Sequence, residues 1–157
     1  MIPAQLAHLQ HQPEALSRLI ADLTDAQLRQ PPLPGKWSIF EQIAHLGRYH
    51  QVFSQRLTRI ADEYVPHFDR YVADTDPHFA EWLALPLGTL LSHLHRDRAV
   101  LIEQLRTYPA ETLSRRGVHP VFGPMNMTGW TEFFLLHEAH HLFAIIRLAA
   151  PFRLQTG

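Results

Sequence analysis

The spacing of apolar residues limits what this chain can fold into. Apolar side chains recur at steps of three and four along nearly the whole sequence, which is the period of an amphipathic helix, and no segment alternates for long as a half-buried strand does. We therefore expect no strands and four long helices, at about 3–22, from 39 onward, at 87–107 and at 128–150. Pro13 should kink or restart the first of them. The second helix shows the clearest stripe: Ile39, Ile43, Leu46, His50, Phe53, Leu57 and Ile60.

Polar and proline residues mark the expected helix ends. Ser38 can accept the free amide of Glu41, and the Glu41 side chain can reach back to Ser38, so this capping box predicts a helix that begins directly after Ser38. Thr128 offers a cap for the last helix. Pro151 should end that helix at Ala150, because proline cannot donate an intrahelical hydrogen bond.

Two long connections separate the helices. Residues 62–86 carry three prolines with aromatic residues between them, and residues 108–127 carry a second run of proline and glycine. Long loops in a small domain are often functional, so the first connection could cover a site. Four long helices with long links after the second and third predict an all-α fold, a four-helix bundle with long crossover connections. We expect a single domain over 1–157.

The composition excludes several kinds of chemistry and partner. The chain has no cysteine, so any metal must be held by nitrogen and oxygen. Its 14 Lys+Arg nearly balance 15 Asp+Glu, so we expect neither nucleic acid nor a membrane surface as a partner. Residues 1–16 lack the basic start and the unbroken apolar run of a signal peptide, which predicts a cytoplasmic protein. Histidine is in excess, with 12 residues.

The stretch "LLHEAHHLFAI" places two of these histidines on one buried face. His137 and His141 lie one turn apart on the apolar stripe of the last helix, where both can point at one ion about 2 Å from each nitrogen. The two side chains fit two roles equally well. They can be core histidines bonded to nearby carbonyls or carboxylates, or they can be metal ligands.

The pattern His137-Glu138-x-x-His141 is also that of zinc proteases, in which the glutamate is the general base. Such an enzyme needs a third ligand after this helix. The remaining residues, "LFAIIRLAAPFRLQTG", contain no Asp, Glu or His, so the sequence disfavours a protease. Glu138 is about 100° around the helix from His137, and we interpret it as a residue of the polar face.

A third histidine ligand would have to come from elsewhere in the chain. The second helix offers His45 and His50. Periodicity favours His50, which lies on the apolar stripe, whereas His45 lies roughly 120° away around the helix. The pattern alone leaves both residues open.

Three segments resemble the DinB/YfiT-like superfamily. "PGKWSIFEQIAHLG" resembles its Gly-x-Trp-Ser/Thr loop, which leads into a helix whose histidine precedes a leucine. "HEAHHLFAI" resembles its last-helix motif of two histidines with three residues between them, and "LIADLTDAQLRQPPLPGKW" agrees in order and separation. The resemblance covers nearly the whole chain. It implies a metal triad of His45, His137 and His141, with His50 as a supporting or substitute residue. Many relatives have a polar residue where this chain has Ala144, so no supporting contact is expected from that position.

The resemblance also implies a cofactor and an activity. The cofactor would be one divalent metal ion, zinc or nickel first and manganese or iron next, held by three neutral imidazoles with water in the open positions. Members with a known activity are similar to thiol transferases that use a low-molecular-weight thiol, and some act as isomerases or hydrolases. Around this site, Trp37, Tyr49, Trp130 and Phe134 could line the pocket of a small-molecule substrate, and Arg48 or Arg147 could meet a substrate carboxylate. The same aromatic residues could instead belong to the core, with the arginines in solvent. A homodimer is common among such bundles.

Three functions stay open at this point. The first is a metal-dependent transferase that activates a small thiol. The second is a non-catalytic bundle that binds a metal or a small ligand, which the absence of a polar side chain at Ala144 slightly favours. The third is a metal-dependent hydrolase of an amide or ester, for which Glu138 or His50 would be the candidate catalytic base.

Overall fold

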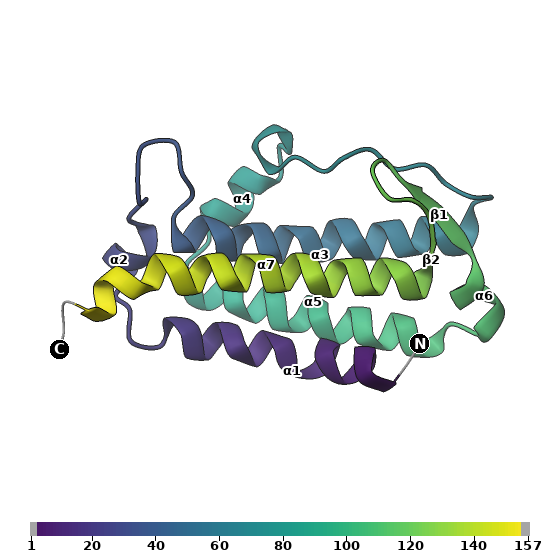
Figure 1. Ribbon diagram of the computed structural model, residues 1–157, viewed down its shortest axis with the longest axis horizontal. Helices are drawn as coiled ribbons and strands as arrows, with labels where there is room; N and C mark the ends of the chain where they lie inside the picture. The colour runs from purple at the N-terminus through teal and green to yellow at the C-terminus, as the bar shows by residue number, and fades with distance from the viewer. Residues whose placement is uncertain (1–2, 155–157) are drawn as a thin grey trace.

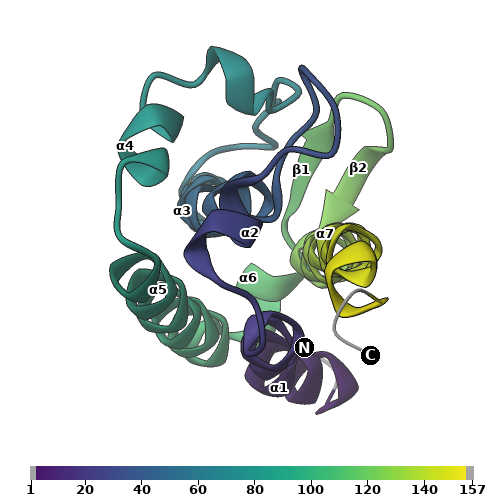
Figure 2. The same ribbon diagram turned by 90° about the vertical axis from the view of Figure 1, so that its left-hand side faces the viewer.

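Four long helices form the body of the molecule, as the periodicity predicts. The computed structural model describes residues 3–154, in which α1 (Pro3–Ile20), α3 (Ile39–Asp62), α5 (Leu87–Thr107) and α7 (Met127–Leu154) lie along the long axis (Figure 1). Contacts join α3 to α5, α5 to α1, α1 to α7 and α7 to α3, and they close the ring that Figure 2 shows end-on. The predicted all-α four-helix bundle is confirmed.

The helices do not alternate in direction. α3 and α5 run the same way and α1 and α7 run the opposite way, so the link between α3 and α5 returns along the bundle (Figure 1). This crossover, residues 63–86, carries the 3-10 helix η1 (Ala73–Thr75) and α4 (Phe79–Leu83). α2 (Asp25–Arg29) lies between α1 and α3, and α6 (Ala110–Ser114) follows α5.

The starts of α3 and α7 are both capped by side chains. Ser38 Oγ accepts the amide of Glu41 at 3.2 Å, and Glu41 Oε2 accepts the amide of Ser38 at 2.7 Å, so the predicted capping box is confirmed. At α7 the prediction was wrong by two residues. Asn126 Oδ1, and not Thr128, accepts the amide of Gly129 at 2.9 Å.

Two prolines lie inside helices without ending them. Contrary to the prediction, α7 continues through Pro151 for a further turn. α1 continues through Pro13 as one helix, so it does not restart there. Tertiary contacts stabilise the last turn of α7. Phe152 packs against the core, and Arg153 donates to the Asp22 carboxylate at 2.9 Å. These contacts offset the hydrogen bond that the proline removes.

A two-stranded hairpin lies before α7, where the sequence predicted no strand. β1 (Arg116–His119) and β2 (Gly123–Asn126) pair antiparallel with His119 opposite Gly123. The strands have four residues each, too few to show alternation, and their stability comes from packing. A Cβ on Gly117 would lie 2.8 Å from Ile60 Cγ1 on α3, so only glycine allows this approach.

The hairpin also holds the crossover in place. The amide of Val118 donates to the carbonyl of Pro66 at 2.8 Å, and the amide of Phe68 donates to the carbonyl of Val118 at 3.1 Å. The two long connections therefore meet on the side of the bundle formed by α3 and α7 (Figures 1 and 2).

One buried guanidinium connects all four long helices. From α5, Arg98 donates through Nε to His50 Nε2 on α3 at 2.9 Å and through Nη2 to Glu138 Oε1 on α7 at 2.5 Å. Through Nη1 it donates to the carbonyl of Leu9 on α1 at 2.9 Å. That carbonyl is free because Pro13, four residues on, has no N–H. Arg98 and Glu138 are 3% and 1% exposed, so the bundle interior holds a buried ion pair.

Among the described residues, α7 is the one helix long and apolar enough to cross a membrane by length and composition. The core helix of a water-soluble bundle meets the same criterion. Here α7 packs against both α1 and α3.

Replacing Arg98 by methionine should lower the free energy of unfolding by about 3–5 kcal/mol, because the Glu138 carboxylate would stay buried without a counter-charge. Denaturant unfolding measures this loss. The double variant Arg98→Met/Glu138→Gln should recover part of it. Arg96→Met, which removes an exposed arginine paired with its neighbour Asp97, should cost less than about 1 kcal/mol. Equal losses for Arg98→Met and Arg96→Met would contradict the role of the ion pair.

Candidate metal centre

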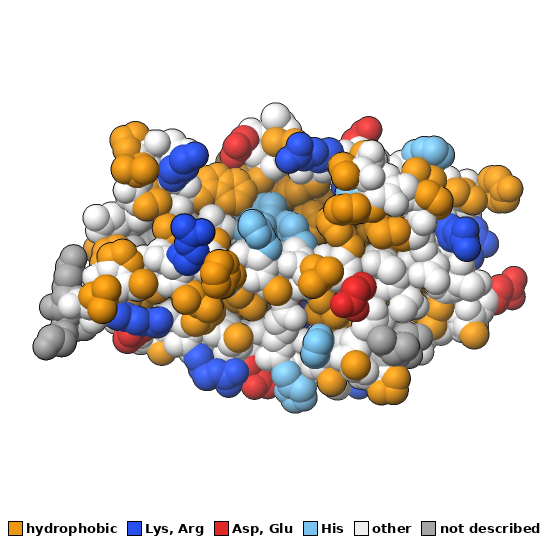
Figure 3. Space-filling model, in the orientation of Figure 1, with side chains coloured by type: hydrophobic (Ala, Val, Ile, Leu, Met, Phe, Trp, Pro, Cys, Tyr) orange, Lys and Arg blue, Asp and Glu red, His pale blue; other side chains and the backbone are white. Residues whose placement is uncertain are grey.

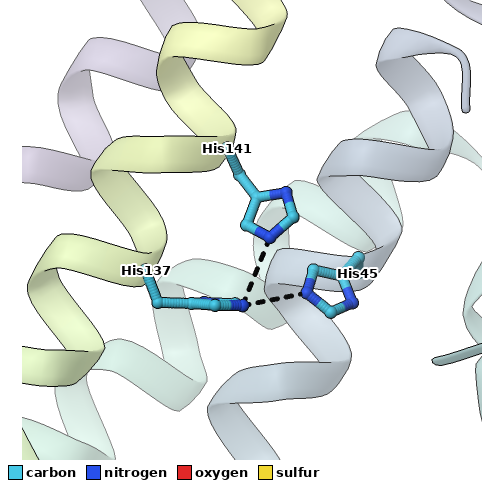
Figure 4. Close-up of side chains that lie close together, drawn as sticks. All are labelled: His45, His137 and His141. Atoms are coloured by element: carbon cyan, nitrogen blue, oxygen red, sulfur yellow. Dashed lines mark hydrogen bonds between the residues drawn. The ribbon is translucent and has the colours of Figure 1, made fainter. Parts of the chain in front are cut away.

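Three histidines from two helices converge beneath the long connections. His45 comes from α3, and His137 and His141 come from α7 (Figure 4). The Nε2 atom of His137 lies 3.1 Å from that of His45 and 3.2 Å from that of His141. The (i, i+4) spacing places the α7 pair on one face, and the contact between α3 and α7 brings the third ring to them.

The two short spacings, and a third pair within 4.8 Å, bring these nitrogens close enough to share a single cation. A tetrahedral ion bound at about 2.0–2.1 Å from each nitrogen would hold two of them roughly 3.3–3.4 Å apart. Hydrogen bonding explains the cluster less well, because one nitrogen of a neutral imidazole either donates or accepts. His137 Nε2 faces both neighbours and can satisfy only one of them. A shared cation would satisfy all three lone pairs.

Gln42 orients one of the three rings. Its Oε1 atom lies 2.6 Å from Nδ1 of His141, and because a carbonyl oxygen only accepts, the proton must lie on Nδ1. The lone pair of Nε2 then points toward the other two rings. No supporting contact was expected from position 144, which is alanine, and His50 was the residue expected to support the ligands. The structure supplies the support from Gln42 on α3, one turn before His45, a spacing that could have been noticed in the sequence.

Burial keeps all three histidines in the neutral form that binds metals. It lowers the pKa of His45 to about 4, and the charge of Asp74 opposes this shift. Burial also lowers the pKa of His141 to about 3 and that of His137 to about 2, and the neighbouring histidines lower both further. The folded chain therefore offers unprotonated nitrogens well below neutral pH.

His50 and Glu138, the two candidate catalytic bases, do not reach this cluster. His50 lies on the apolar stripe, where Nδ1 donates to the carbonyl of Leu46 at 2.7 Å and Nε2 accepts from Arg98. We predicted Glu138 on the polar face of the helix, but it lies inside the bundle and pairs with Arg98. The prediction failed because its partner lies 40 residues away in the sequence.

A cavity of about 600 Å³ opens above the three histidines. Figure 3 shows pale blue histidine side chains in a hollow on this face, with hydrophobic side chains around it. Trp37 and Tyr49, which we predicted to line a substrate pocket, line this cavity. Arg48 and Trp130 do not. Arg48 donates to the Asp76 carboxylate at 2.6 Å, and Trp130 is fully buried in the core.

Sequence reasoning missed several residues of the cavity wall. Most belong to the two connections, whose fold local patterns do not predict. They are Arg56, Arg70, Tyr71, Val72, Ala73, Asp74, His119, Val121, Phe122, Phe133 and His140.

The fold and the cluster define a class: a four-helix-bundle protein with three histidines able to hold a metal ion. Within that class the chain belongs to the DinB superfamily, whose family model matches residues 8–145. This confirms the resemblance found in the sequence.

Known proteins agree with this assignment. A Bacillus pumilus protein named "Putative metal-dependent hydrolase" is 31% identical over 153 residues, which cover 92% of this chain and 81% of the relative. YfiT from Bacillus subtilis has the same fold, with a TM-score of 0.82 and 20% sequence identity. The match covers 95% of this chain and 86% of the YfiT chain, and YfiT is described as a probable metal-dependent hydrolase with an unusual four-helix bundle topology. TT2238, a four-helix bundle protein, has a TM-score of 0.67 and 27% identity over 90% of this chain and 95% of its own.

Gln42→Ala should weaken metal binding by about 10–100-fold, because it frees the His141 ring to rotate and to change tautomer. Competition with a chelator of known affinity measures the change. Gln55→Ala removes an exposed glutamine from the same helix and serves as the control. An unchanged affinity for Gln42→Ala would show that this contact does not support the site.

The metal-free protein should lose stability as pH falls below 6.5. A histidine with a normal pKa of 6.5 in the unfolded chain takes up a proton there, while His137, with its lowered pKa, stays neutral in the fold. Between pH 7.5 and 5.5 each such histidine should cost about 1.4 kcal/mol. Denaturant unfolding at both pH values measures this cost. The free energy of unfolding of His137→Asn should fall between pH 7.5 and 5.5 by about 1.4 kcal/mol less than that of the wild type. An equal loss in the two proteins would contradict the lowered pKa.

Proposed function

We propose that the protein is a metal-dependent hydrolase that holds one divalent ion at His45, His137 and His141. The main support for this proposal is that three neutral imidazole nitrogens converge at the floor of an open cavity. Three protein nitrogens with the remaining positions facing a cavity are typical of a catalytic metal site rather than a structural one. The name of the Bacillus pumilus relative points to the same class of reaction.

When bound, a zinc or nickel ion would polarise a carbonyl and lower the pKa of a neighbouring water or thiol. The chain's own proton acceptor in this proposal is Asp74. Asp74 lines the cavity, and its charge raises the pKa of His45 against the effect of burial. Within residues 3–154 no hydrogen bond ties this carboxylate to another group, which leaves it able to accept a proton.

Transfer of a small thiol is the second candidate, and the composition is compatible with it. The chain has no cysteine, so a thiol nucleophile would arrive with a low-molecular-weight cosubstrate. The same metal and the same cavity would serve that reaction, which needs no water. The two candidates differ in whether a thiol must be present for turnover.

Untagged protein should bind zinc or nickel at one ion per chain. Replacing His45, His137 or His141 by alanine should weaken this binding by more than about 100-fold, because removal of a ligand costs more affinity than removal of a residue that only orients one. Elemental analysis after dialysis, followed by titration, measures both. His8→Ala, which removes an exposed histidine of α1, should bind as the wild type does. If the wild type takes up no stoichiometric metal, the proposed site is wrong.

The metal-loaded protein should hydrolyse activated aryl esters or anilides without added thiol, and Asp74→Asn should lower kcat by about 10²–10⁴-fold, the range of general base catalysis. Asp69→Asn, at an exposed residue outside this cavity, is the matched control. A parallel assay with an alkylating fluorogenic probe and a panel of small thiols tests the second candidate. Turnover that requires a thiol would favour transfer over hydrolysis, and no turnover in either assay would reject both.

A further inference from the structure

One arginine in the cavity wall carries a buried charge that no carboxylate balances. Arg56 of α3 is 7% exposed and lines the cavity above the histidines. Its Nη1 atom donates to the Tyr49 hydroxyl at 3.3 Å and its Nη2 atom to the carbonyl of Asp69 at 2.8 Å. Among residues 3–154 it forms no ion pair. A buried cation without a counter-ion is costly, so its retention at a cavity wall points to an anion from outside the chain.

Aromatic rings surround the rest of the Arg56 guanidinium. Its central carbon lies 5.5 Å from the ring centre of Phe68, 5.6 Å from that of Trp130 and 6.0 Å from that of Tyr49. Cation–π contacts of this kind offset part of the cost of burial and leave the charge in place. They also limit the motion of the side chain, so the charge stays at a defined position in the wall.

A second donor stands on the hairpin side of the same cavity. His119, the last residue of β1, accepts at Nδ1 from the amides of Val121 at 3.1 Å and Phe122 at 3.2 Å. The ring proton therefore lies on Nε2. Nε2 has no hydrogen-bond acceptor among residues 3–154, and this atom is not fully buried. Burial and then the charge of Arg56 lower the pKa of His119, so the ring stays a neutral donor at neutral pH.

The surroundings of His119 are apolar on the cavity side. Its ring centre lies 4.8 Å from that of Phe122 and 4.8 Å from that of Phe133, and both phenylalanines line the cavity with Val121. Asp74 is the one acidic residue among the described lining, against Arg56 and Arg70. The wall therefore offers the fixed positive charge of Arg56, one neutral N–H donor and an aromatic surface beside them.

We propose that Arg56 and His119 form a subsite for the carboxylate of the substrate, and that the substrate is a small organic acid with an apolar or aromatic body. A single guanidinium matches the one negative charge and the two oxygens of a carboxylate. The aromatic rings would contact the body of the molecule. This inference names the substrate class of the proposed function, and it rests on that function for the reaction.

Binding of two matched probes to metal-free protein tests the subsite apart from catalysis. The probes are 3-phenylpropanoate and its neutral amide, 3-phenylpropanamide, with affinities measured by calorimetry. The carboxylate should bind at least tenfold more tightly than the amide. Arg56→Gln should abolish this preference, and His119→Gln should reduce it severalfold. Arg59→Gln, which removes an exposed arginine of the same helix that pairs with Glu63, should keep it.

Several outcomes would overturn the proposal. They are equal affinity for acid and amide in the wild type, no binding of either probe, or an unchanged preference in Arg56→Gln. If Arg56→Gln does not fold, as circular dichroism would show, the comparison in the wild type and the effect of His119→Gln remain decisive. A preference for the acid in a protein without hydrolytic activity would reject the proposed function alone. Hydrolysis of charged and neutral esters at equal rates would reject the subsite alone.

Discussion

The bundle depends on the buried guanidinium of Arg98. An arginine inside a small helical core is costly unless every donor finds an acceptor, and here each of its three contacts is on a different helix. One of these acceptors, the carbonyl of Leu9, exists because Pro13 leaves it unpaired. Helix α7 cannot rotate about its axis without separating Glu138 from this charge. The ion pair therefore sets which side of α7 faces α3.

The histidine cluster follows from that rotation. With Glu138 turned toward α5, the next residues on the neighbouring side of α7, His137 and His141, face α3 and meet His45. Burial then removes their protons, and Gln42 holds one ring in the orientation that directs its lone pair to the centre. A structural ion pair and a metal-ligand set thus occupy adjacent sides of one helix, and the first positions the second.

The two long connections turn this cluster into the floor of a cavity. Parallel α3 and α5 require a crossover along the bundle, and the hairpin before α7 binds that crossover through Val118. The crossover contributes Asp74 to the cavity wall and the hairpin contributes His119. The rigid helices hold the metal ligands while the connections carry the groups that would contact a substrate, a common division of roles between scaffold and loops.

The sequence by itself determined the four helices, the capping box at Ser38 and the pairing of His137 with His141, because helical periodicity and capping depend on residues within one or two turns. Only the tertiary structure decided the rest. Periodicity favoured His50 because an apolar stripe marks the core, yet the cluster lies beside the core, where α3 meets α7. Glu138 is buried, and the hairpin forms, because each has partners far away in the chain. Such contacts arise only once the helices have packed, so no local pattern encodes them.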